Sequence, residues 1–322
     1  MDCNHRLRSC SLSRPRLFII ASLVFVFLLF QFVTIDELQI IHFKHRQGGK
    51  RLEPDQFDST CSRAADQRGP HQKIISYSIY GNFCRAEIAK KYLKPFIQTL
   101  TRIPSVYPGW VVRIYHNVTK DDGETWNMIN NTLNLGNHID FCNATEIIRN
   151  RKLADIFAMT WRWLPLLDNM VDTLMSRDSD SYIITREADA VQAWLAGDRA
   201  FHIMRDHPSH CRFIVGTGCW GVKVSQNRSS IVRAATSMFT QNHLHEYDYD
   251  QKLLDKLIWP IAYNNMIAHD SYCCERLPLT HPYPTKRKDG LFIGWRAVPK
   301  EELQFPCPPK CRPANTSDWS FC

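Results

Sequence analysis

The stretch VDTLMSRDSDSYIITREADA, residues 171–190, holds the features that decide the fold. An apolar run leads to Asp178 and Asp180, and side chains two residues apart on a strand point to the same side. Thr185 is suited to cap a following helix that stops at Gly197. We therefore expect an acidic pair between the end of a strand and the start of a helix, where ligands bind in α/β sheets.

The two carboxylates of this pair suit a hard divalent cation. Mg²⁺ and Mn²⁺ prefer oxygen ligands and keep positions open for phosphate oxygens. Such a cation can stabilise the charge that develops on a departing nucleotide diphosphate. Asp-x-Asp also occurs by chance as a polar turn before a helix, so the rest of the chain has to decide between the two interpretations.

The composition is that of an ordinary globular protein. Of 322 residues, 44% are hydrophobic and 22% are charged, which is enough to bury a large core and excludes general disorder. The net charge of +8 is spread along the chain, and the basic cluster at residues 286–288 has no interleaved aromatic residues. Nucleic acid is therefore not an expected partner.

The N-terminal segment predicts a single membrane anchor. Four arginines between residues 6 and 16 precede residues 17–33, an uncharged apolar stretch long enough to cross a bilayer. It is longer than the apolar core of a cleaved signal peptide, and no small-residue cleavage site follows it. We expect a cytosolic tail over residues 1–16, a signal-anchor over residues 17–35 and a luminal remainder. The short apolar length fits a Golgi or early secretory membrane.

Sequons and cysteines agree with a luminal location. Acceptor sequences for N-glycosylation begin at Asn117, Asn130, Asn143, Asn227 and Asn315. Ten of the twelve cysteines follow the anchor, an even number that we expect to form disulfides in an oxidising lumen. The alternative is a zinc site at Cys307 and Cys311, but no second close pair or nearby histidine accompanies them.

The luminal part divides into three segments by composition. Residues 36–72 are polar and glycine-containing and predict a stem. Residues 73–299 alternate strand and helix patterns and predict one catalytic body. Residues 300–322 are rich in cysteine and proline and predict a tail held by disulfides.

The body has the rhythm of a mostly parallel sheet flanked by helices. Strands are expected at residues 73–80, 110–116, 139–142 and 200–205, and helices at residues 85–101 (broken at Pro95), 124–133, 153–167 and 250–261. The 153–167 helix would present Asp155 and Arg162 on its polar face, and Asp250 would cap the 250–261 helix. Glycines within residues 213–224 would let a ligand approach the backbone. A nucleotide would lie near Tyr80, Gly81 and Asn82, where the first strand ends.

Several segments carry a resemblance to a known class of enzymes. They are SRDSDS at residues 176–181, FHIMRDHPSH at 201–210, GCWG at 218–221, DQKLL followed by IWP at 250–260, and HDSYC at 269–273. Their order resembles the GT-A class of nucleotide-sugar glycosyltransferases, and more closely a little-described group of glycosyltransferase-like domains. The resemblance extends over residues 73–295 and implies a GT-A-like α/β fold, a nucleotide-sugar donor, and Mn²⁺ or Mg²⁺.

The resemblance also implies roles for the donor side of the site. Asp178 and Asp180 would bind the metal, with His269 as the third ligand and Asp270 or His281 as alternatives to it. Asp155 would contact sugar hydroxyls. Independently of the resemblance, Tyr80, Gly81 and Asn82 at a strand end and Arg162 on the polar helix face are, with Asp178, further candidates for binding the donor.

On the reacting and acceptor side, Asp250 and Gln251 would border the reacting carbon. Arg205, Asp206, His207 and Trp220 would line the acceptor side. Asp206 is the candidate base of an inverting enzyme, and His207 is another. The sequence lacks the Gly-Gly that many retaining families place before the acidic pair, so both stereochemical outcomes stay open.

The favoured hypothesis is a single-pass type II Golgi membrane enzyme that transfers a sugar to a glycan or glycoprotein. The alternative is a catalytically inactive luminal protein that uses the same fold to bind carbohydrate or to act as a scaffold. A metal-dependent phosphotransferase or hydrolase would also use carboxylates, but the sequence offers no convincing nucleophile or second metal cluster for it.

Overall fold

A computed structural model describes residues 57–118, 123–277, 279–296, 303–314, 316 and 318–322, all of which belong to one compact unit. The expected cytosolic tail, the expected anchor, the first part of the stem and Asn315 lie outside the described residues. Within the described ranges, no helix is both long enough and apolar enough to span a bilayer.

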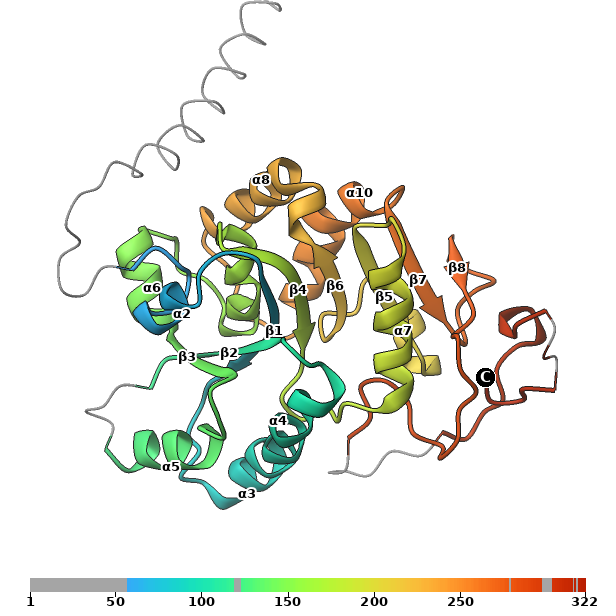
Figure 1. The fold of residues 1–322 in the computed structure, drawn as a ribbon, viewed down its shortest axis with the longest axis horizontal. Coiled ribbons are helices and arrows are strands. Elements are labelled where there is room, and N and C mark those ends of the chain that lie inside the picture. The colour runs from blue at the N-terminus through green and yellow to red at the C-terminus, as the bar shows by residue number, and fades with distance from the viewer. Residues whose placement is uncertain (1–56, 119–122, 278, 297–302, 315, 317) are drawn as a thin grey trace, which may run out of the picture. The chain divides into compact units, whose positions relative to one another are not determined.

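A mixed eight-stranded sheet forms the centre of the described part of the chain (Figure 1). In spatial order its strands are β3 (Ile139–Asn143), β2 (Val111–His116), β1 (Gln72–Ile79), β4 (Val171–Arg177), β6 (Cys219–Lys223), β5 (Phe201–Arg205), β7 (Met266–Asp270) and β8 (Thr280–His281). Strand β6 is antiparallel to β4 and β5, and the other neighbours are parallel. The predicted α/β fold with a mostly parallel sheet is confirmed at this level.

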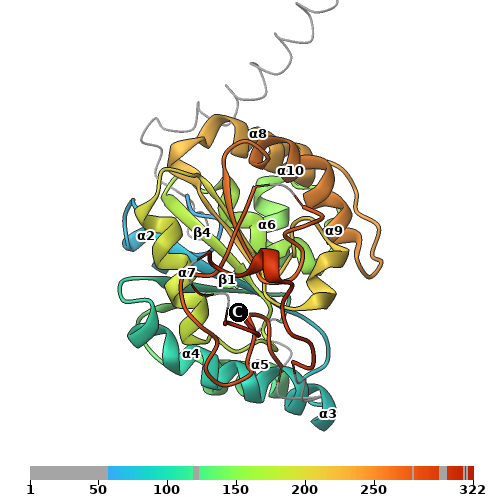
Figure 2. The same cartoon turned by 90° about the vertical axis from the view of Figure 1, so that its right-hand side faces the viewer.

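Helices cover both faces of the sheet (Figure 2). One face carries α3 (Ala86–Ile88), α4 (Lys94–Val106), α5 (Glu124–Leu133) and α7 (Thr185–Ala196), and the other carries α6 (Ala144–Arg151), α8 (Arg228–Phe239), α9 (Tyr249–Leu253) and α10 (Trp259–Ala262). Two separate apolar cores result. Consecutive strand residues enter opposite cores, as the pleat requires: Ile74 and Leu174 enter one, and Ile75 and Met175 enter the other.

Short π and 3-10 segments complete the fold. The π-helical turns are η1 (Ala89–Leu93) and η6 (Leu254–Ile258), and the 3-10 turns are η3 (Ala158–Leu167), η4 (Pro208–Arg212), η5 (Val224–Gln226) and η7 (Pro309–Cys311). The expected break at Pro95 is wrong, because the helical path continues from η1 through α4. Pro95 lies in the first turn of α4, where a missing backbone N–H costs least.

The expected amphipathic helix over residues 153–167 is also wrong. Residues 153–157 are not helical, and η3 is a 3-10 helix that is buried from Thr160 to Leu167. Tryptophans and leucines surround the axis in this run, so it has no polar face. Arg162 is consequently interior, with only 4% of its side chain exposed, rather than on a solvated face.

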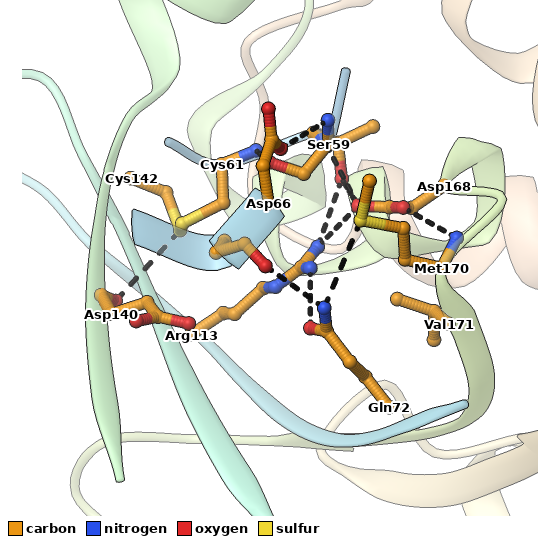
Figure 3. Close-up of polar contacts among 12 residues, drawn as sticks. Ser59, Cys61, Asp66, Gln72, Arg113, Asp140, Cys142, Asp168, Met170 and Val171 are labelled. Atoms are coloured by element: carbon orange, nitrogen blue, oxygen red, sulfur yellow. Dashed lines mark hydrogen bonds and ion pairs between the residues drawn. A yellow bond between two sulfur atoms is a disulfide. The ribbon is translucent and has the colours of Figure 1, made fainter. Parts of the chain in front are cut away.

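Residues 57–71, which we expected to end the stem, fold against the body instead (Figure 3). They form α2 (Arg63–Gln67), and a disulfide joins Cys61 to Cys142 at the end of β3. The backbone N–H of Thr60 donates to Asp168 Oδ2 over 2.8 Å. The folded body therefore begins before Lys73.

Asp168 is the acceptor of a buried network in this region (Figure 3). Arg113 donates to it over 2.6 Å and, through its second terminal nitrogen, to Gln72 over 2.9 Å. Burial alone would raise the pKa of Asp168, but Arg113 and the backbone N–H of Thr60 bring it below its ordinary value. Asp168 thus stays ionised and ties β2 to the segment before β4.

Among the described residues, the disulfides are Cys61–Cys142, Cys211–Cys273, Cys274–Cys311 and Cys307–Cys322. The expectation that all luminal cysteines pair is wrong for two of them, because Cys84 and Cys219 are free thiols. The expected stapling of the C-terminal tail is confirmed. Cys307 and Cys311 are each bonded to another cysteine, which excludes the zinc alternative at that pair.

Replacing Asp168 with asparagine should lower the free energy of unfolding by about 3 to 5 kcal/mol, because Arg113 would remain charged and buried without its carboxylate. Equilibrium unfolding in urea measures the loss. The control is Glu87→Gln, which breaks an exposed pair with Arg85 and should cost less than about 1 kcal/mol. A loss for Asp168→Asn as small as that of the control would contradict this role for the network.

Candidate functional site

The strand order creates a reversal between β1 and β4. The chain leaves β1 towards β2 and β3 on one side and later returns to β4 on the other side of β1. In α/β sheets such a reversal opens a crevice at the carboxyl ends of the strands. The residues that follow β1, beginning at Tyr80, and the residues that follow β4, beginning at Asp178, lie at this point.

The acidic pair lies between β4 and α7, as predicted. Asp178 directly follows the strand, and Asp180 is in the turn after it, so the two are not successive outward positions of one strand. The expected cap is wrong, because Ile184 rather than Thr185 occupies the cap position of α7, while the stop at Gly197 is confirmed.

The two carboxylates influence each other electrostatically. The side chain of Asp178 is 41% exposed and that of Asp180 is 14% exposed. Burial, followed by the negative charge of Asp178, raises the pKa of Asp180 to about 6. The negative charge of Asp178 thus makes ionisation of Asp180 less favourable, and a cation beside Asp180 would offset that effect.

Arg162 joins three segments at the site. Its guanidinium donates to Asp178 Oδ1 through Nη1 and to Asp250 Oδ2 through Nη2, the latter over 3.2 Å. The backbone N–H of Arg162 donates to Ser78 Oγ on β1 over 3.0 Å. Burial would lower the pKa of Arg162, but Asp178 and Asp250 raise it, so the guanidinium stays charged.

Asp250 and Gln251 belong to the same cluster. The expectation that Asp250 caps its helix is wrong, because α9 begins at Tyr249 and Asp248 precedes it. The carboxylate of Asp250 faces Arg162 instead, and burial raises its pKa. Gln251 donates to the carbonyl of Val215 over 3.3 Å, while its buried Oε1 has no hydrogen-bond partner among the described residues. A buried acceptor without a protein partner beside this cluster has an unmet hydrogen-bonding requirement.

The glycine-containing segment before β6 shapes the space around Asp178. A Cβ on Gly218 would lie 2.0 Å from Asp178 Oδ2, so only glycine leaves that carboxylate its position. A Cβ on Gly216 would meet nothing closer than an ordinary contact at 3.9 Å. The space beside Gly218 is therefore filled by the side chain of Asp178 rather than left for a ligand.

Tyr80 lies on the β1 side of the same cluster. Burial raises the pKa of Tyr80 to about 12, and Arg162, Asp250 and Asp178 all act on it electrostatically. Its ring meets the edge of Trp161 at a centroid distance of 6.2 Å. Gly81 follows with a φ of +107°, which glycine tolerates, and Asn82 Oδ1 accepts from the backbone N–H of Cys84.

The structure does not bring His269 to the acidic pair. His269 is a buried residue of β7 whose Nδ1 lies 2.8 Å from His202 Nε2. Both proposed substitutes are elsewhere too: Asp270 is bonded to Arg205, and His281 lines a hollow of about 470 Å³ at the amino end of β7. Within the described ranges, no three His, Cys, Asp or Glu side chains group as metal ligands.

Two carboxylates nevertheless fit Mn²⁺ or Mg²⁺, because such ions are commonly held by one or two carboxylates and complete their shell with water and substrate phosphates. The charge relation between Asp178 and Asp180 agrees with that donor set. The residues fit an open cation site and not a closed cage of three protein ligands.

Asp206 cannot serve as the expected base. Its carboxylate is fully buried and accepts from Arg186, Arg287, Ser271 and the backbone N–H of Ile293. Burial would raise the pKa of Asp206, but Arg186 and Arg287 bring it below its ordinary value. A carboxylate saturated with donors and held ionised has no lone pair to take a proton from an acceptor hydroxyl.

The other predicted acceptor residues are structural as well. Arg205 is buried and donates to Asp270 over 2.7 Å and to the carbonyl of Ile214 over 2.6 Å. Trp220 packs in the core against Trp163. His207 accepts from the backbone N–H of Ser209 at the start of η4 and stacks on Phe292. Arg205 and Trp220 are therefore closed to an acceptor, while a role of the half-buried His207 on the acceptor side stays a prediction.

Asp155 is exposed, and it lies on the segment that leads into η3. Its carboxylate is 3.2 Å from His245 Nε2, and its carbonyl accepts from the backbone N–H of His243. The 242–245 loop thus holds Asp155 in place. Contact with a donor sugar stays a prediction for this residue.

The sequon asparagines have different environments. Asn117 is exposed, Asn130 is half-buried within α5, Asn143 caps α6 by accepting from the backbone N–H of Glu146, and Asn227 precedes α8. Their glycosylation stays a prediction.

Sequence reasoning missed two contacts at the site. Arg296 lies 3.7 Å from Asp180, and Gly218 accommodates Asp178. Both contacts join residues far apart in the chain, so no local pattern signals them. In the sequence, Arg296 is visible only as a basic residue after Trp295, and Gly218 only as a glycine before Cys219.

Comparison with known proteins adds no identity to these observations. No known family model matches the chain, and no curated protein matches it significantly.

The buried pair His202 and His269 should make stability pH-dependent. Burial lowers the pKa of His269 to about 4 and that of His202 well below its ordinary value, and the ring of Trp194 stacks on His202. Unfolded histidine titrates near 6.5. Between these values the unfolded chain binds more protons than the folded chain. The stabilisation that the two neutral histidines contribute is therefore complete above pH 6.5 and is lost as the pH falls towards 4.

Replacing His269 with glutamine should therefore flatten the decline of unfolding free energy between about pH 6.5 and 4.5, because one buried titrating ring is removed while a hydrogen-bonding group is retained. Urea unfolding of both proteins across that range measures the two slopes. Identical slopes would show that His269 does not titrate differently in the folded state.

Proposed function

We propose that the protein is a glycosyltransferase that moves a sugar from a nucleotide-sugar donor to a glycan or glycoprotein, on a GT-A-like fold. The observation that carries the proposal is the position of Asp178 and Asp180 at the carboxyl end of β4, beside the reversal next to β1. Nucleotides bind at such reversals, and paired carboxylates suit the cation that accompanies a diphosphate.

Asp178 and Asp180 would hold Mn²⁺ or Mg²⁺. When bound, the ion would stabilise the charge that develops on the leaving diphosphate. The glycine at 218 supports this role because it leaves the room that the Asp178 carboxylate occupies.

Three further residues would position the donor. Tyr80, 40% exposed, offers an aromatic face near the end of β1. Gln251 Oε1 offers an unpaired acceptor for a sugar hydroxyl, and Arg162 fixes Asp250 beside it. Together these side chains would supply an aromatic surface and a hydrogen-bond acceptor near the Arg162 cluster.

The location is proposed on separate grounds. Four disulfides favour folding in an oxidising compartment. With the apolar stretch at residues 17–33, they support a Golgi type II membrane protein whose body is luminal.

A second candidate is a non-catalytic carbohydrate-binding or scaffold protein. The observation in its favour is the pairing of Arg162 with Asp178, which already neutralises one of the two carboxylates. In that case the cluster would only join η3, β4 and α9.

The test is release of nucleoside diphosphate by the purified full-length chain in detergent, across a panel of nucleotide sugars with Mn²⁺. Asp178→Asn and Asp180→Asn should each lower turnover at least about 100-fold, because charge stabilisation in the transition state is lost. Asp198→Asn is the control, since that side chain is 93% exposed and lies outside the cluster. Absence of turnover with every donor, and equal Mn²⁺ binding by all variants, would favour the scaffold.

A matched pair of glycine variants sharpens the same assay. Gly218→Ala forces the Asp178 carboxylate to move and should reduce turnover as Asp178→Asn does. Gly216→Ala meets only an ordinary contact and should retain turnover. Equal activity of the two alanine variants would contradict the importance of the position of Asp178.

A further inference from the structure

The C-terminal segment lies against the acidic turn. We name residues 287–296 the C-terminal wall. The backbone N–H of Tyr182 donates to the carbonyl of Trp295 over 3.1 Å, and Ser181 Oγ donates to the carbonyl of Gly294 over 3.4 Å. The rings of Tyr182 and Trp295 are 5.3 Å apart. The wall is thus joined to the turn that directly follows Asp180.

Asp206 anchors the other end of this wall. Arg287 and the backbone N–H of Ile293 both donate to its buried carboxylate, over 3.0 and 3.1 Å. Arg186 of α7 and Ser271 after β7 donate to the same group. Because every partner is buried, the wall is fixed to the sheet and to α7, and its last residues have a defined place.

Arg296 stands at the end of the wall beside Asp180. Its Nη1 is 3.7 Å from Asp180 Oδ2, and its side chain is 38% exposed. A partly exposed arginine at this distance from Asp180 can also contact an anionic group that lies beside that carboxylate. Phosphate oxygens suit it, because the planar guanidinium donates two parallel hydrogen bonds to them.

We propose that Arg296 binds the diphosphate of the nucleotide donor. This inference rests on the proposed transferase function and adds a residue to its donor site. The ligand class follows from the chemistry: an arginine beside a cation-binding carboxylate, at the carboxyl end of β4, is suited to a dianionic group that the cation also contacts.

The experiment measures binding of UDP, GDP, CDP and ADP to the full-length chain in detergent with Mn²⁺, by titration calorimetry. Arg296→Met should weaken binding of the nucleoside diphosphate that binds most tightly by at least tenfold, in line with loss of a charge-assisted hydrogen bond to phosphate. Arg296→Lys should recover part of the affinity. Lys310→Met removes one exposed positive charge elsewhere, since Lys310 is 80% exposed, and should bind as the unchanged protein does.

The outcomes separate the two proposals. If the unchanged protein bound a nucleoside diphosphate and Arg296→Met bound it within twofold of the same affinity, the role of Arg296 would be overturned and the transferase proposal would stand. Binding of no nucleoside diphosphate by the unchanged protein would overturn both. An equal loss in Arg296→Met and Lys310→Met would assign the effect to net charge and would also overturn the role of Arg296.

Discussion

The structure depends most on the requirement that a buried guanidinium be paired. Arg162 is almost fully enclosed, so its charge has to be met by carboxylates from within the fold. Asp178 and Asp250 meet it, and they come from the end of β4 and from α9. If either carboxylate moved away, the buried guanidinium would lose part of the charge that compensates it, which is costly. The same pairing that holds these elements together therefore fixes the residues of the candidate site.

Similar pairs join other elements of the body. Each places an arginine from one segment against a carboxylate from another, with both side chains buried: Arg113 with Asp168, Arg177 with Glu187, Arg205 with Asp270, and Arg186 and Arg287 with Asp206. Buried ion pairs add little net stability compared with apolar packing, but breaking one is costly. We interpret these pairs as devices that select one arrangement of strands and helices.

Local sequence patterns predicted the helices and strands, whereas contacts between residues far apart in the chain decided the roles of individual residues. The strands around Ile75 and Ile114 and the helix ending at Gly197 follow from periodicity and a stop signal, which act over a few residues. The assignment of Asp206 failed because its partner Arg287 is distant in the chain, so a buried anchor has the same local sequence as an exposed turn. The prediction that Arg162 lies on a polar helix face was wrong for a related reason. A run of tryptophans and leucines places its whole segment in the core.

The central claim is that a nucleotide binds at the carboxyl ends of β1 and β4. Crosslinking with a photoactivatable nucleoside diphosphate, followed by mass spectrometry, tests it most directly on the full-length chain. We expect modified peptides that contain Tyr80 or residues 178–182, with labelling abolished by excess unmodified nucleotide. Modification confined to the hollow near Trp194 and His281, at the other end of the sheet, would contradict the claim.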